Sequence, residues 1–115
     1  MLVIKMKLEL KENMYYRTYS GSINKITSIK DYNEREYLLN GFYINKDIIK
    51  KASYNIIDIL EVGDYVNGHR VEEINFEDEE IFTDSEYYCG IVEFCNIKSV
   101  ITREQMEQMA YKVGD

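Results

Sequence analysis

The sequence predicts a mainly β fold, namely a small, antiparallel, partly closed barrel of the SH3-like kind with one or two short helices. Short stretches rich in β-branched and aromatic residues recur along the 115-residue chain, as expected for many short strands. Two Asn-Gly pairs separate apolar runs, and this is the strongest short-range signal for a hairpin. Closure is economical because it removes exposed sheet edges. No linker or long repeat divides the chain, so we expect a single domain over residues 1–115.

The N-terminal third predicts a strand followed by a hairpin. Over residues 2–11 apolar and charged side chains alternate with a period of two, as a strand with one buried face requires. The aromatic stretch 15–19 predicts the next strand, and Ser20-Gly21-Ser22 predicts its turn. The isoleucines within residues 23–29 then predict the returning strand.

The two Asn-Gly pairs predict two further hairpins, because both positions of a tight hairpin turn need positive φ. Asn40-Gly41 lies between two apolar runs within residues 35–44, and Asn67-Gly68 lies within residues 65–71. Two such turns in one short chain favour an antiparallel meander.

Helices are predicted in two places. Asn45 or the pair Lys46-Asp47 is a suitable start for one or two helical turns that run to about Ala52. The sequence Thr-Arg-Glu-Gln at residues 102–105 matches a capping box, so we expect a short helix over about 103–109.

The C-terminal half predicts an acidic turn and three more strands. The four consecutive acids at 77–80 predict a loop or an exposed hairpin tip. Residues 90–95 and 96–101 have the β-branched and aromatic bias of strands, and residues 110–113 are expected to close the sheet.

The net charge of -7 is unevenly distributed along the chain. Residues 1–54 carry ten Lys/Arg against six Asp/Glu, whereas residues 55–115 carry four against fifteen. The second half therefore favours a partner protein with a basic surface, and nucleic acid is disfavoured as a partner. The first eleven residues lack a continuous apolar run, so we expect a cytoplasmic protein without a membrane partner.

The sequence offers no constellation for catalysis or for a metal. His69 is the only histidine and directly follows a predicted turn, so a catalytic triad or dyad lacks its base. Cys89 and Cys95 are too few and too widely spaced for a structural zinc site, and we expect two reduced thiols. No phosphate-binding glycine loop occurs. We therefore expect a protein that is not an enzyme and needs no cofactor.

The candidate partner-binding surface is the acidic and aromatic segment between residues 77 and 93. Its residues are Glu77, Asp78, Glu79, Glu80, Phe82, Asp84, Glu86, Tyr87 and Tyr88. Aromatic anchors can supply affinity while the surrounding charges steer a basic partner. A solvated acidic hairpin that only keeps the protein soluble is the competing interpretation.

Eleven tyrosines suggest a second candidate surface, because a tyrosine-rich sheet face can stack nucleic-acid bases. Tyrosine is also a good strand former and an amphipathic filler for a small barrel. A stacking surface would need a basic groove as well, and only the N-terminal half carries an excess of Lys and Arg.

Three stretches resemble a group of small, largely uncharacterised proteins from phages and prophages of clostridia and related low-GC Gram-positive bacteria. They are YYRTYSGSINKI (15–26), KDIIKKASYNIIDILEVGDYVNGHRVEEI (46–74) and IKSVITREQMEQMAYKVG (97–114). The resemblance implies a small β-barrel of phage origin and carries no catalytic residues to transfer. Two departures stand out: Ala52 replaces the histidine of the usual KHS, and the acidic 77–93 segment is not a feature of the group.

These observations lead to one functional hypothesis and two alternatives. The first is a non-enzymatic phage or prophage protein that binds a host protein with a basic surface, such as a defence nuclease, and inhibits it in the manner of an anti-CRISPR. The alternatives are a nucleic-acid-binding or regulatory barrel with a tyrosine-rich face, and a virion or packaging component. Homo-oligomerisation through strand edges would mark the last of these.

Overall fold

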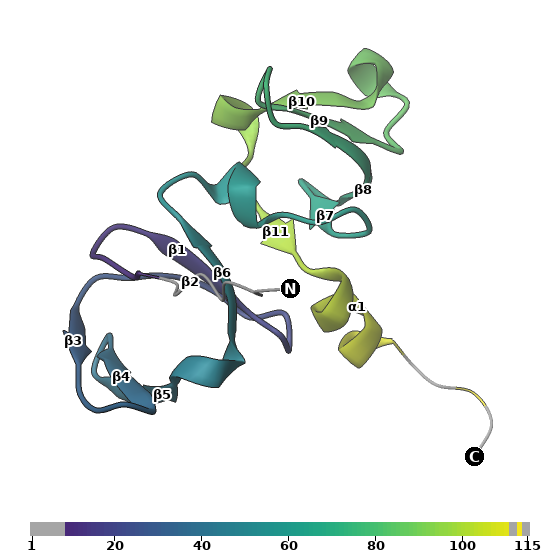
Figure 1. Cartoon of the computed structure of the whole chain (residues 1–115). Coiled ribbons are helices and arrows are strands. Elements are labelled where there is room, and N and C mark those ends of the chain that lie inside the picture. Colours follow the sequence, from purple (N-terminus) through teal and green to yellow (C-terminus); the bar gives the residue numbers. More distant parts are fainter. Residues whose placement is uncertain (1–8, 111–112, 114–115) are drawn as a thin grey trace, which may run out of the picture.

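The computed structural model describes residues 9–110 and 113, apart from the side chain of Tyr88. The fold is mainly β, with three antiparallel sheets and one α-helix, which confirms the predicted fold class. No closed barrel forms among the described residues, in keeping with a partly closed one. Figure 1 shows two small sheets at one end of the molecule and the strands of residues 69–93, labelled β8, β9 and β10, at the other.

The N-terminal half forms two three-stranded sheets. The first has the order β2-β1-β6 and the second the order β3-β4-β5. The strands are β1 (Tyr15–Thr18), β2 (Ile23–Lys25), β3 (Ile29–Asp31), β4 (Glu36–Leu39), β5 (Phe42–Asn45) and β6 (Ile49–Ser53). The predicted hairpin at 15–29 is therefore confirmed as β1 and β2, although β2 stops at Lys25 and Ile29 begins a strand of the other sheet.

The C-terminal half forms a five-stranded sheet with the order β10-β9-β8-β7-β11. Its strands are β7 (Tyr65–Val66), β8 (His69–Asn75), β9 (Glu80–Thr83), β10 (Ile91–Glu93) and β11 (Val100–Ile101). Residues 77–79 lie in the turn between β8 and β9, and Glu80 begins β9, so the predicted hairpin tip is confirmed.

Two separate hydrophobic clusters hold these sheets together. The first lies between the two N-terminal sheets and consists of Leu10, Tyr16, Ile26, Tyr37, Leu39 and Ile49. The second packs beneath the five-stranded sheet and consists of Ile57, Leu60, Val66, Val71 and Ile81. Each cluster is small for a core, so contacts between the halves matter for a single cooperative fold.

Both Asn-Gly turns form as predicted, with positive φ at Asn40 (51°), Gly41 (84°), Asn67 (52°) and Gly68 (85°). In each turn the asparagine side chain also reaches a distant segment of the chain. Oδ1 of Asn40 accepts the backbone N–H of residues 27 and 28, and Oδ1 of Asn67 accepts those of residues 98 and 99. The turns thus fix tertiary contacts as well as strand register.

Of the two predicted helices, the second is confirmed and the first is largely wrong. Helix α1 (Arg103–Met109) begins with a complete capping box between Thr102 and Gln105. The residues after Asn45 form only a single 3-10 turn, Lys46–Ile48, and the chain then continues as β6. Pairing of β6 with β1 and burial of Ile49 outweigh the local helix signal.

Three strand predictions need correction. Residues 9–11 of the predicted first strand are not in a strand, and its residues 2–8 lie outside the described residues. Phe94–Asn96 is a 3-10 turn, which shortens the predicted strands 90–95 and 96–101 to β10 and β11. Residues 110 and 113 are not in a strand, and residues 111–112 lie outside the described residues.

Candidate functional site

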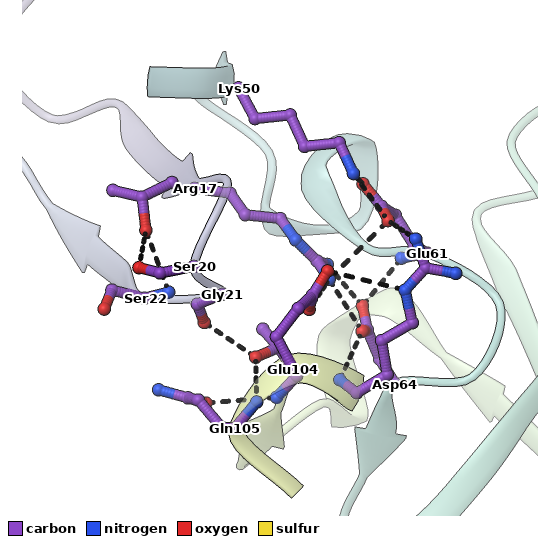
Figure 2. A network of polar contacts seen from close by, with 12 residues as sticks. Arg17, Ser20, Gly21, Ser22, Lys50, Glu61, Asp64, Glu104 and Gln105 are labelled. Carbon is purple, nitrogen blue, oxygen red and sulfur yellow. Dashed lines mark hydrogen bonds and ion pairs between the residues drawn. The ribbon is translucent and has the colours of Figure 1, made fainter. Parts of the chain in front are cut away.

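A buried arginine joins the two halves of the molecule (Figure 2). Arg17 on β1 is fully buried, with a side-chain exposure of 0%. Its guanidinium donates to both carboxylate oxygens of Asp64, at 2.5 Å and 2.9 Å, and to the carbonyl oxygen of Ile59 at 3.0 Å. The planar guanidinium fits this two-oxygen geometry.

Two further carboxylates complete this ion-pair network. Arg17 Nη2 lies 2.8 Å from Glu104 Oε2 on α1 and 3.7 Å from Glu61 Oε1. Glu61 also lies 2.8 Å from Lys50 Nζ and 2.9 Å from the Arg103 guanidinium. The network therefore connects β1, β6, the turn at residues 61–64 and helix α1.

The charges of the network shift three pKa values in the direction that preserves the ion pairs. Burial alone would raise the pKa of Glu61, but the hydrogen bond from Lys50 and the charge of Arg17 outweigh burial and lower that pKa to about 2. Burial also acts to raise the pKa of Glu104, and its backbone hydrogen bond and Arg17 lower it below its ordinary value. The pKa of Arg17 is raised, because its bond to Asp64 outweighs burial.

The network holds the fold together and offers little to a ligand. Its carboxylates are paired with cations of the same chain. Of the three nitrogens of the Arg17 guanidinium, only Nε has no hydrogen-bond partner among the described residues. The three stretches that carry the family resemblance each contribute to it, through Arg17, Asp64 and Glu104. We interpret these stretches as the structural frame of the fold.

The structure divides the predicted partner-binding residues between two ends of one strand. Glu77, Asp78 and Glu79 are exposed in the turn before β9. Asp84, Glu86 and Tyr87 follow the other end of β9, and Tyr87 is 77% exposed. Each residue of a strand adds about 3.3 Å, so the two groups stand more than a strand length apart. The side chain of Tyr88 lies outside the described residues.

Glu80 and Phe82 lie between these two groups, on the outer face of the sheet β8-β9-β10. Ile81 and Thr83 of the same strand are buried, and side chains alternate between the two faces of a strand. Glu80 and Phe82 therefore point away from the core.

Cross-strand partners extend this outer face into two rows. Glu73, Phe82 and Ile91 form one row, and Asn75, Glu80 and Glu93 form the next. We call these six residues the acidic face. The surrounding segment, residues 69–93, contains nine Asp/Glu and a single Lys/Arg, so the potential over this face is negative.

Within the acidic face, Glu80 and Glu93 are direct cross-strand partners. The N–H of Phe94 donates to the carbonyl of Glu79, at 2.9 Å, in the same register. Hydrogen-bonded and non-bonded pairs alternate in an antiparallel ladder, so Glu80 and Glu93 form a non-bonded pair, in which side chains approach most closely. Like charges in such a pair destabilise a sheet. A cation from outside the chain would remove that repulsion.

The sequence analysis named Glu80 and Phe82 as partner-binding residues, but not Glu73, Ile91 and Glu93. Glu73 is distant in sequence and meets Phe82 only through a register shift between residues 71 and 73 of β8. The signal that could have identified Ile91 and Glu93 is the alternation of side chains between the two faces of β10: Val92 packs on the core, and its two neighbours are exposed.

The tyrosines do not assemble into one surface. Tyr16 and Tyr37 are buried in the first hydrophobic cluster. Tyr32 and Tyr43 form an exposed edge-to-face pair with ring centroids 4.9 Å apart. Residues 30–46 around that pair carry three Lys/Arg and three Asp/Glu, so this pair lacks the basic groove that a base-stacking surface needs.

The other groups with chemical potential are dispersed. Cys89 and Cys95 are exposed free thiols, and His69 Nδ1 lies 3.8 Å from Asp84 Oδ1 at the surface. Within residues 9–110 no group of three His, Cys, Asp or Glu side chains is arranged to hold a metal ion. In the same part of the chain, no helix has the length and apolar character to span a membrane.

Comparison with known proteins identifies no relative: no family model, curated protein or solved structure matches this chain. The functional inference therefore depends on the geometry and charge of the surfaces described above.

Proposed function

We propose that this chain is a non-enzymatic binding protein that docks on a basic protein surface through the acidic face. The observation that carries the proposal is the Glu80–Glu93 pair, in which two glutamates lie opposite each other on the outer face of the sheet, next to Phe82 and Ile91. Ile91 is 39% exposed and Phe82 is half-buried. An apolar centre flanked by charges is the usual anatomy of a protein interface.

The two acidic groups beyond the face have a different role in this proposal. Glu77 and Asp78 lie in the exposed turn, and Asp84 and Glu86 lie at the far end of β9. Rim charges of this kind accelerate association with an oppositely charged partner and contribute little to the lifetime of the complex.

The resemblance to phage proteins suggests the identity of the partner. Under this proposal the partner is a nuclease of a host defence system, whose nucleic-acid channel supplies a basic surface, and the chain acts as an anti-CRISPR-like inhibitor. The assignment to phage and to host defence depends on the resemblance alone, whereas docking through the acidic face depends on the structure.

The experiment is capture of binding proteins from nuclease-treated clostridial lysate with the tagged protein and two variants. The test variant is Glu80→Lys/Glu93→Lys, and the matched control is Glu12→Lys/Glu34→Lys, which makes the same charge change at exposed residues outside the face. The partner is a basic protein that wild type and control retain and the test variant loses.

Titration with the purified partner then gives the size of the effect. An exposed ion pair contributes about 0.2–1 kcal/mol. Charge reversal at Glu80 and Glu93 replaces attraction to a basic partner by repulsion at both residues. We expect the test variant to bind at least about tenfold more weakly, or about 1.4 kcal/mol. Equal affinity of test and control variants contradicts the proposal, as does recovery that disappears with the nucleic acid.

A further inference from the structure

Strand β10 is the free edge of the five-stranded sheet, because it pairs with β9 on one side and ends the strand order (Figure 1). Its register with β9 pairs Ile91 with Phe82, Val92 with Ile81 and Glu93 with Glu80. An open edge presents unpaired backbone groups that can accept another strand.

The hydrogen-bond ladder shows which backbone groups of β10 face outward. Phe94 bonds to Glu79 at the end of the ladder, so by alternation Val92 also directs its backbone groups toward β9. Ile91 and Glu93 therefore direct their N–H and C=O groups away from the sheet. The 3-10 turns that flank β10, Tyr87–Gly90 and Phe94–Asn96, use the N–H of Ile91 and the C=O of Glu93 for their own i→i+3 bonds. Within the described part of the chain, the C=O of Ile91 and the N–H of Glu93 remain open toward a further strand.

We propose that the partner adds an extended segment to the edge of β10, antiparallel to it, and so continues the sheet by one strand. The inference rests on the proposed function, and it specifies how the acidic face is engaged. The occupant is a segment of a basic protein, because the row Asn75, Glu80 and Glu93 ends at this edge and Glu93 is exposed there. Backbone bonds would supply affinity and alternate side chains would supply specificity.

The register defines the sequence that this edge recognises. A residue opposite Glu93 shares the outer face with it, so this residue is Lys or Arg, which also lies within reach of Glu80. Two positions later, in the antiparallel direction, the residue opposite Ile91 is apolar. The recognised pattern is therefore a basic residue, any residue and an apolar residue.

Substitutions at Glu93 can distinguish the effect of the backbone N–H at the edge from the effect of the side-chain charge. Glu93 has φ of -73°, which matches the angle fixed by proline, and its N–H faces outward, so Glu93→Pro is compatible with the fold and with pairing to β9. Glu93→Gln removes the same charge and retains the N–H. Both variants lack the charge of Glu93, and only the proline variant also lacks the N–H at the edge.

The probe is the end-capped peptide Ser-Thr-Lys-Thr-Ile-Thr-Ser, titrated into isotope-labelled protein and followed by amide NMR. We expect saturable binding with slower hydrogen exchange at the N–H of Glu93. We expect Glu93→Gln to weaken binding a few-fold and Glu93→Pro to weaken it by about a further tenfold. Equal affinities of the two variants would overturn the inference.

Modified peptides give a second readout on the wild-type protein. N-methylation of the peptide isoleucine blocks the N–H that faces the C=O of Ile91, whereas N-methylation of the central threonine blocks an N–H that faces away from β10. We expect binding to be lost in the first case and kept in the second. Equal effects of the two methyl groups, or no binding of the peptide at all, overturn edge pairing. The proposed function stands independently if the partner still requires Glu80 and Glu93, because side chains alone would then make the contact.

Discussion

Replacement of Arg17 by methionine tests whether the buried network unites the two halves of the fold. The change retains an apolar stem of similar length and removes the guanidinium that bonds Asp64, Glu104 and the Ile59 carbonyl. Loss of one partner from a buried ion pair costs roughly 3–5 kcal/mol, because the other charge remains buried without compensation.

The surroundings place the expected loss for Arg17→Met near the lower end of that range. Asp64 retains backbone N–H donors from Glu61 at 2.7 Å and from Arg103 at 3.0 Å. Glu104 is partly exposed, with a side-chain exposure of 21%, so water can replace its lost bond. We therefore expect a loss of about 3 kcal/mol, which is a large fraction of the roughly 5–15 kcal/mol typical of a domain.

The assay is urea unfolding at neutral pH, followed by circular dichroism, of wild type, Arg17→Met and Arg35→Met. Arg35 is exposed in the loop before β4, so its replacement should change the unfolding free energy by less than about 0.5 kcal/mol. A loss below about 1 kcal/mol for Arg17→Met, comparable with the control, would refute the structural role of the network.

Three further predictions follow from individual residues. The pKa of Glu61 is lowered to about 2 in the folded state. Its contribution to stability, up to about 3 kcal/mol, is therefore complete above about pH 4.5 and disappears as the pH falls toward 2. Urea unfolding at pH 7 and pH 3 should show a smaller pH dependence of the unfolding free energy for Glu61→Gln than for wild type, and an unchanged dependence contradicts this. Gly90→Ala should lower the melting temperature more than Gly41→Ala. Both residues have positive φ, but a Cβ at residue 90 would clash with the backbone carbonyl of Thr83, whereas a Cβ at residue 41 meets nothing within 4 Å. Equal melting temperatures of the two variants would rule out that clash. Glu93→Gln should raise the unfolding free energy by a few tenths to about 1 kcal/mol by relieving repulsion with Glu80, and a loss of stability would mean that the two carboxylates do not repel.

The elements that the sequence predicted well are those specified by local chemistry. Asn40-Gly41 and Asn67-Gly68 fix hairpins because the turn itself demands positive φ. Thr102 begins α1 because its side chain bonds the backbone N–H of Gln105. In each case the residues that decide the structure lie within four positions of one another.

The elements that the sequence did not predict depend on distant partners. Strand β6 forms because it pairs with β1, about 35 residues earlier in the chain. The burial of Arg17 was missed because arginine is almost never fully buried without partners, and its carboxylate partners lie in the turn at 61–64 and in α1. The acidic segment was recognised, but its division between two ends of β9 follows from sheet register, which local composition does not encode.

The buried arginine also has a consequence for the order of events during synthesis. Arg17 precedes all three of its partners along the chain, and its bonds to Ile59, Asp64 and Glu104 span 42, 47 and 87 residues. Contacts of such separation form late, since chain entropy opposes them until most other structure is present. A nascent chain lacks the last of these partners until α1 has emerged from the ribosome. The hairpins of the N-terminal half can therefore form early and remain reversible, and the native state is fixed only after α1 has been synthesised.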